Sequence, residues 1–228
     1  MYKNIKVLKK AENLETKFSL VKLEDKLKHT GLIPLGIGEI NGYSSIAPIL
    51  ISGTSSKEFA LFIGLSPINN IFTYSKMLDE PRFLKSYPFV MVNAKNQDGK
   101  IIDVIGIDNN SDVVSSTKDI SIFQDNGKLS SVAQNMIDNL KLLHTQRKIS
   151  RDLIQELEDR DLLKKQSFNV KVKDEVKTIL KDYFIVDRVK LNKLDDKTLA
   201  LWSRKGWMGI IEAHCYSLRN FKKIVDMI

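Results

Sequence analysis

Pro88, which lies between Tyr87 and Phe89, constrains the fold of this chain more than any other residue. Proline has no amide hydrogen and disfavours the helical conformation for the residue before it, so a helix cannot continue through Tyr87. Upstream, a glutamate followed by Pro81 is typical of a helix start. The sequence therefore predicts a short helix from Pro81 to about Ser86, followed by a strand that begins at Phe89.

A β-hairpin is predicted directly after this helix. Its first strand is 89–92, and the following residues are rich in turn formers and end in Asp98-Gly99. The segment 101–107 is almost continuously apolar, which predicts a returning strand that is buried on both faces. We therefore expect Tyr87 and Phe89 to be core residues.

Two carboxylates accompany this hairpin. Asp103 lies within the returning strand and is expected to be buried, and Asp108 lies at the end of the strand. A buried carboxylate needs a partner, and the nearest basic side chains in the sequence are Arg82 and Lys85. An ion pair that holds the Tyr-Pro-Phe segment is the expected arrangement.

The chain has two regions of different character. Residues 1–125 are mostly strands and turns, with a predicted hairpin from 46–51 and 58–65 in which Pro48 favours an edge position. Residues 126–228 are mainly helical, with a long apolar stripe that begins after a capping box at Ser131. A small antiparallel sheet is predicted there from 168–172, 176–180 and 183–186.

These regions predict an α+β fold, with mainly antiparallel sheet in the N-terminal half, and helices plus a small antiparallel sheet in the C-terminal half. We expect residues 1–228 to form a single compact protein, with 1–125 and 126–228 as possible lobes.

Several short motifs, in their order and spacing, resemble the SapC family of small bacterial proteins associated with surface layers. The resemblance covers roughly residues 30–225, and its motifs are Tyr87-Pro88-Phe89, Gly64-Leu65 with Asn70, Phe123 to Gly127, Val186-Asp187 with Leu191 and Leu194, and Ile211 to His214 with Ser217. Two positions depart from the family pattern. Asp182 stands where the family has a glycine before its Tyr-x-Val-Asp segment, and Asp174-Glu175 stands where it favours Asp-Gly.

The formal charge of +8 does not predict specific nucleic-acid binding. Only seven of the 36 basic residues are arginine, and basic and acidic residues alternate through the helical region. Weak adsorption to an acidic polymer or membrane surface is compatible with this pattern.

The chain contains no run of about 18 apolar residues, so no transmembrane segment is predicted. The first ten residues have the charge of a signal peptide but lack its apolar centre. We therefore expect a soluble cytoplasmic protein, with surface association by signal-independent export as the alternative. Cys215, the single cysteine, permits no internal disulfide.

Common catalytic, cofactor and metal motifs are absent from the sequence, so no cofactor and no metal site are expected and catalytic residues are unknown. His214 is predicted to be a structural histidine near the end of a helix at Ser217, whose hydroxyl could cap the next helix. The candidate binding residues are Arg82, Tyr87, Asp108, His214 and Ser217.

Two functional hypotheses follow. The resemblance implies a non-enzymatic accessory of surface-layer protein production, handling or export, which would act through protein–protein contact and expose an apolar patch or groove. The alternative is an enzyme or small-molecule-binding protein with a pocket between the two lobes, lined by Arg82, Tyr87, Asp108 and His214. The absence of catalytic motifs favours the first hypothesis.

Overall fold

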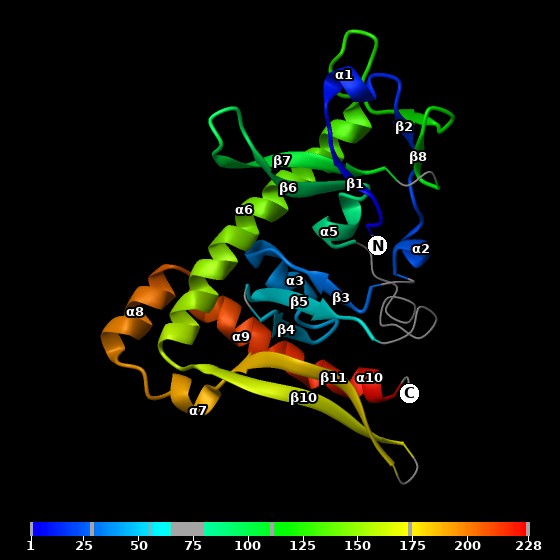
Figure 1. Cartoon of the computed structure of the whole chain (residues 1–228). Coiled ribbons are helices and arrows are strands. Elements are labelled where there is room, and N and C mark those ends of the chain that lie inside the picture. Colours follow the sequence, from blue (N-terminus) through cyan, green and yellow to red (C-terminus); the bar gives the residue numbers. More distant parts are fainter. Residues whose placement is uncertain are drawn as a thin grey trace. The chain divides into compact units, whose positions relative to one another are not determined.

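The structure is a computed structural model that describes residues 2–27, 30–54, 56–64, 80–109, 112–172 and 175–226. The chain forms two compact units, and each unit combines segments that are far apart in the sequence. Unit 1 comprises Met1–Thr30 and Glu80–His144, and unit 2 comprises Gly31–Asp79 and Thr145–Ile228. Helices and antiparallel sheets occur in the described residues of both units, which confirms the α+β class (Figure 1).

Unit 1 contains two small antiparallel sheets and the first part of the long helix α6. One sheet has the strand order β1-β7-β6 and the other has the order β8-β2-β9. The elements of this unit are β1 (Ile5–Val7), α1 (Lys10–Asn13), β2 (Lys17–Phe18), α2 (Leu23–Leu27), α5 (Arg82–Lys85), β6 (Phe89–Lys95), β7 (Ile101–Asp108), β8 (Val114–Ser115), β9 (Ile120–Ser121) and α6 (Ser131–Asp159), which continues into unit 2.

The predicted break at Tyr87 is confirmed, because α5 ends at Lys85 and β6 begins at Phe89. The peptide bond between Tyr87 and Pro88 is cis. The hairpin of β6 and β7 is also confirmed, and Met91 faces Ile105 across it.

The prediction that the returning strand is buried on both faces is wrong for its first half. Ile101 is 69% exposed and Ile102 is 43% exposed, and Asp103, which we expected to be buried, is exposed as well. Burial increases along β7 until Asp108 is fully buried. The reason is that only the base of the hairpin reaches the packed core of unit 1, whereas the end near the turn extends beyond it.

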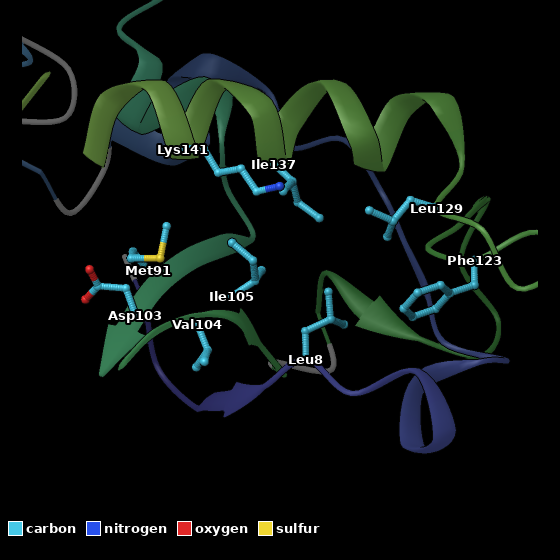
Figure 2. Close-up of a pocket in the computed structure, with 9 residues that line it drawn as sticks. All are labelled: Leu8, Met91, Asp103, Val104, Ile105, Phe123, Leu129, Ile137 and Lys141. Carbon is cyan, nitrogen blue, oxygen red and sulfur yellow. The ribbon is translucent and has the colours of Figure 1, made fainter. Parts of the chain in front are cut away.

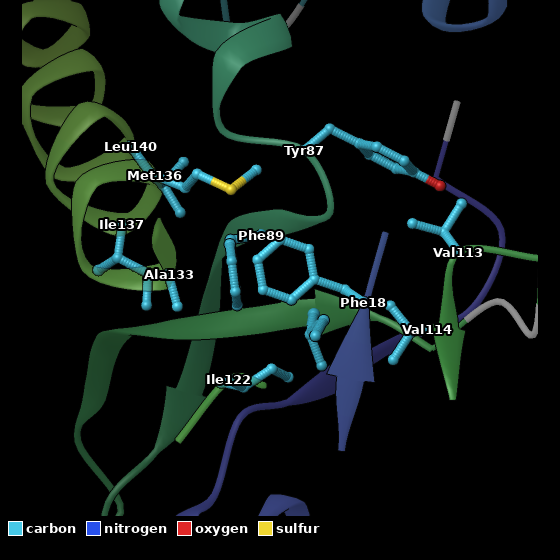
Figure 3. Packing of buried hydrophobic residues seen from close by; sticks show 11 residues of the cluster. Phe18, Tyr87, Phe89, Val113, Val114, Ile122, Ala133, Met136, Ile137 and Leu140 are labelled. Carbon is cyan, nitrogen blue, oxygen red and sulfur yellow. The ribbon is translucent and has the colours of Figure 1, made fainter. Parts of the chain in front are cut away.

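Figure 3 shows the core of unit 1, in which one face of α6 packs against aromatic and β-branched side chains. Phe89 is fully buried and meets Phe18 edge to face, with ring centroids 5.6 Å apart. The predicted helical stripe is confirmed for α6, which contributes Ala133, Met136, Ile137 and Leu140. Burial of an aromatic side chain of this size stabilises the fold by about 1.5–3 kcal/mol.

Unit 2 is built on a five-stranded antiparallel sheet with the order β10-β11-β4-β5-β3. Its elements are β3 (Leu32–Pro34), η1 (Ile37–Glu39), α3 (Ile40–Tyr43), β4 (Ile49–Ser52), β5 (Glu58–Phe62), β10 (Leu163–Val172), β11 (Glu175–Val186), α7 (Arg188–Leu191), α8 (Asp196–Arg204), α9 (Trp207–Ser217), η2 (Leu218–Asn220) and α10 (Phe221–Val225). The predicted hairpin of the first region appears as β4 and β5, with Ile51 opposite Phe59.

The edge position that Pro48 suggested is wrong, because β4 lies between β11 and β5. Pro48 comes immediately before the first residue of β4, where its missing amide hydrogen removes no ladder bond. Its carbonyl accepts a 2.8 Å hydrogen bond from the amide of Phe62.

The predicted antiparallel pairing in the C-terminal half is confirmed as the β10–β11 hairpin, but 176–180 and 183–186 form one strand, β11. The hairpin is not a separate small sheet, because a register pair between Phe184 and Ile51 joins it to β4. Asp182, which stands in place of the expected glycine, has a φ of 57°. This is the left-handed conformation that glycine adopts freely and that aspartate tolerates better than most residues. Asp174 of the other departure, together with Leu65 and Asn70 of the family motifs, lies outside the described residues.

Candidate functional site

Tyr87 and Asp108 form the polar centre of unit 1. The Tyr87 hydroxyl donates a 3.0 Å hydrogen bond to Oδ2 of Asp108, and the two side chains are 6% and 0% exposed. Asp108 is the last residue of β7, and its own amide donates a 2.9 Å bond to the carbonyl of Pro88. The Tyr-Pro-Phe segment and the end of the hairpin are thereby held together.

The carboxylate of Asp108 also holds the N-terminal segment of the chain. The amide of Asn4 donates to Oδ1 at 2.8 Å, and the amide of Lys3 donates to both oxygens at 3.2 Å. The Tyr2 hydroxyl donates a 3.0 Å bond to the carbonyl of Phe89, and the Tyr2 ring meets Tyr87 edge to face. The charge of Asp108 is therefore compensated by oriented N–H and O–H donors.

The ion pair that we expected between Asp108 and Arg82 or Lys85 is therefore not the arrangement found. Arg82 lies on α5, and its Nη1 donates a 2.7 Å bond to Oδ1 of Asn139 on α6. Asp103 is 2.8 Å from Nε2 of His144. The difference arises because the backbone amides of the N-terminal segment, which are distant in the sequence, occupy the position expected for a cation.

His214 and Ser217 lie on α9 in unit 2, and both contact strand backbone. The amide of Val186 in β11 donates to Nε2 of His214 at 3.2 Å, and the amide of Ile49 in β4 donates to Oγ of Ser217 at 2.8 Å. The Ser217 hydroxyl in turn donates to the carbonyl of His214 at 2.6 Å. It does not cap the following helix as expected, because Ser217 is a helical residue there and makes no side-chain cap bond.

The register of the sheet explains why these two side chains are placed together. β11 and β4 pair at Phe184 and Ile51, and the same register would next place Val186 opposite Ile49. The ladder does not continue to that pair, and the amides of Val186 and Ile49 are bonded instead by His214 and Ser217. The His-x-x-Ser spacing on one face of α9 thus completes the hydrogen bonding between two strands.

The imidazole of His214 is uncharged at neutral pH. Burial lowers its pKa from 6.5 to about 4. Since Nε2 accepts a bond from Val186, the proton of the neutral ring is on Nδ1, which has no hydrogen-bond partner among the described residues. A histidine of this kind stabilises packing and is poorly placed for proton transfer.

The five candidate binding residues thus fall into two groups. Arg82, Tyr87 and Asp108 belong to unit 1, and His214 and Ser217 belong to unit 2. Within the described parts of the chain, no cluster of three or more His, Cys, Asp or Glu side chains could hold a metal ion. In each group the candidate side chains make hydrogen bonds within their own unit: Tyr87 and Asp108 to one another, Arg82 to Asn139, and His214 and Ser217 to strand amides.

An apolar pocket in unit 1 was not predicted at the level of residues. It has a volume of about 540 Å³ and lies beside the β6–β7 hairpin and α6 (Figure 2). Its polar lining residues are Asp103 and Lys141, and its apolar ones are Leu8, Met91, Val104, Ile105, Phe123, Leu129 and Ile137. Met91 and Ile105 face one another across the hairpin, and Ile137 projects from α6 toward the strands.

A weak signal for this pocket exists in the sequence. Apolar residues recur on one face of the hairpin, and Ile137 and Lys141 are one helical turn apart. The same pattern is also produced by a sealed core. Only the tertiary structure shows that Leu8, Met91 and Ile105 are half-buried and pack against the core cluster with space beside them.

A second hollow of about 580 Å³ in unit 1 is more polar, with Glu15, Lys17, Ser121 and Asp125 among its lining residues. These are surface side chains of both charges, which form no convergent set of donors or acceptors. No helix in the described ranges is both long and apolar enough to cross a membrane.

Comparison with known proteins tests the family resemblance directly. No curated protein and no solved structure matches the chain. The sequence model of the SapC family does match, over residues 14–224, which is nearly the whole chain. The chain therefore belongs to the SapC family.

Proposed function

We propose that this protein is a non-enzymatic accessory of surface-layer protein production, handling or export, and that it acts by contacting a protein partner. The observation that carries the proposal is the apolar pocket of unit 1, which has seven apolar side chains among its nine lining residues. Apolar surface that stays open to solvent is typical of a site that a partner covers. In this proposal the protein meets its partner in the cytoplasm.

The hydrogen bonds that the candidate residues make support the same proposal. Asp108 accepts bonds from Tyr87 and from backbone amides, and His214 accepts a bond from the amide of Val186. A general acid or base needs a free position near a substrate and a pKa near the working pH. Burial moves the pKa of His214 away from neutrality, which gives the enzyme hypothesis less support.

The test compares cells that lack the gene with cells that carry variants of it. Deletion is expected to lower the amount of surface-layer protein that reaches the cell surface. Affinity capture is expected to recover a surface-layer or export-related protein. Met91→Lys, which places a charge in the pocket, should weaken both effects, whereas Leu142→Lys on an exposed part of α6 should not.

A different outcome would favour an enzyme or ligand-binding protein. A variant of His214, Arg82 or Asp108 that melts like the wild type and yet behaves like the deletion would show a role for that side chain beyond folding. Unchanged surface-layer output on deletion, with no surface-layer or export protein captured, would contradict the proposal.

A further inference from the structure

One edge of the β7 strand is only partly covered. β1 pairs with its last residues, where Val7 faces Gly106, and the final bond of this contact runs from the amide of Leu8 to the carbonyl of Ile105 at 2.9 Å. The chain then enters α1 at Lys10. No described strand pairs with residues 101–104 of β7 on the side where β1 lies.

The direction of the backbone groups along this edge follows from bonds that are already made. Ile105 and Asn109 bond to Leu8 and Asn4, so odd-numbered residues direct their amide and carbonyl toward β1. Asp108 bonds to Pro88 on the opposite side, toward β6. Ile101 therefore presents its backbone at the β1 edge, beyond the point where β1 ends.

The apolar pocket lies beside the same edge. Consecutive residues of β7, Asp103 to Ile105, line it together with Leu8, the residue at which the contact with β1 ends. Figure 2 shows these residues on one side and Ile137 and Lys141 of α6 on the other. The exposed side chain of Ile101, which lies on the same face of β7 as Asp103 and Ile105, continues the apolar surface toward the hairpin turn.

We propose that an extended, apolar segment of the partner adds to β7 as a strand that continues β1 and places its side chains in the pocket. This inference rests on the proposed function and names the type of partner segment. The contact with β1 shows what this edge accepts, which is an extended backbone in antiparallel register. In strand addition, backbone hydrogen bonds supply affinity and pockets for alternate side chains supply specificity. Because Asp103 and Lys141 carry opposite charges, the lining does not favour a strongly charged segment.

The first test uses a fluorescent peptide of about seven alternating valine and threonine residues, a length that spans a typical strand. Two control peptides carry N-methyl groups, one on the valine amides and one on the threonine amides. In a strand, only one of these sets faces β7. We expect one methylated peptide to bind at least about tenfold more weakly and the other to bind like the parent, since each lost bond changes the affinity severalfold.

The second test changes the protein. Ile101→Pro removes an amide donor at the edge without removing a bond to β6, and it lies at the first residue of a strand, where proline is tolerated. Ile101→Pro should bind the parent peptide at least about fivefold more weakly than Ile101→Ala does. The alanine variant has lost the same side chain but keeps the amide. Met91→Lys should also weaken binding, and Leu142→Lys should not. Thermal melts establish that each variant is folded.

The outcomes separate this inference from the proposed function. If a captured surface-layer or export protein binds wild type and Ile101→Pro equally, strand addition is overturned and the proposed function stands. If no such partner is captured but the peptide shows the one-sided methylation effect, the edge is a strand-binding site and the proposed function fails. Equal binding of all three peptides, or self-association that Ile101→Pro abolishes, would overturn the inference.

Discussion

The hydroxyl of Tyr87 and the carboxylate of Asp108 are joined by a 3.0 Å hydrogen bond inside unit 1. The bond connects the residue at which the chain must leave its helix to the residue at which the hairpin ends. The same carboxylate accepts from the amides of Lys3 and Asn4, so three separate segments of the chain meet at one side chain. This convergence gives the Tyr-Pro-Phe core a structural role for which no ligand is required.

Removal of the Tyr87 hydroxyl should therefore destabilise the protein. In Tyr87→Phe a buried carboxylate loses one of its donors, and we expect the free energy of unfolding to fall by about 1–3 kcal/mol. Urea unfolding measures this loss. Tyr216→Phe is the control, because Tyr216 is 47% exposed and the change should stay within about 0.5 kcal/mol. Equal effects of the two changes would contradict the role assigned to the Tyr87–Asp108 bond.

Acid should destabilise unit 2 through His214. Its pKa is lowered to about 4 in the folded protein, whereas an unfolded histidine titrates near 6.5. The unfolded chain therefore binds the proton first, so the contribution of His214 is complete above pH 6.5 and is lost as the pH falls toward 4. The loss over this window is on the order of 3 kcal/mol.

A variant without a titrating side chain isolates this effect. His214→Gln keeps an acceptor for the amide of Val186 but cannot bind a proton in this range. Its unfolding free energy should fall less steeply than that of the wild type between pH 6.5 and 4, by up to about 1.4 kcal/mol per pH unit. Identical pH dependence in the two proteins would show that His214 is not held neutral by burial.

Asp182 should tolerate glycine well and β-branched residues poorly. Its φ of 57° strains a residue with a branched Cβ, whereas glycine adopts this conformation without strain. We expect the free energy of unfolding of Asp182→Gly to lie within about 1 kcal/mol of the wild-type value. That of Asp182→Val should fall by more than about 1 kcal/mol. The exposed ion pair with Lys165 does not alter this order, because such pairs contribute little. Chemical denaturation of both variants and of Asp182→Asn gives the ranking, and a valine variant as stable as the glycine variant would contradict it.

Alanine substitutions at Gly36 and Gly38 should differ in how much stability a second substitution at Gln146 restores. A Cβ at Gly36 would lie 2.7 Å from the Cβ of Gln146, whereas a Cβ at Gly38 would lie 2.5 Å from its Nε2. Gly36→Ala should destabilise the protein through overpacking, by about 1–3 kcal/mol, and Gly38→Ala should cost less, because it meets the far end of a flexible side chain. Gln146→Ala should relieve Gly38→Ala, because it removes the end of the side chain, and should relieve Gly36→Ala less, because the Cβ remains. A double-mutant cycle measures both couplings, and equal coupling energies would contradict the geometry.

Parts of the fold that depend on local chemistry were predictable. Pro88 excludes a helix at Tyr87, the turn formers before Ile101 define a hairpin, and the 3.6-residue period of apolar side chains defines α6. Each of these inferences uses steric limits or periodicity within a short window. The family was predictable for a related reason, because the order of its motifs is a property of the sequence itself.

The candidate site was predicted only as a set of residue types. Tyr87, Asp108, His214 and Ser217 are buried and make side-chain hydrogen bonds, and the partners in these bonds were not predicted. Apart from the bond between Tyr87 and Asp108, those partners are backbone amides, which have no signature in the sequence. The amide of Asn4 is 104 positions from Asp108, and that of Ile49 is 168 positions from Ser217.

The sequence by itself determined the break between α5 and β6 at Tyr87, the hairpins β6–β7 and β4–β5, the burial of Tyr87 and Phe89, and the family to which the chain belongs. Only the tertiary structure decided that Pro48 precedes an interior strand, that Ile101 and Ile102 are exposed, and that a pocket opens beside β7. Burial and strand neighbours depend on which distant segments come together. A local pattern records the conformation that a segment prefers, whereas its exposure is set by how much of it the rest of the chain covers.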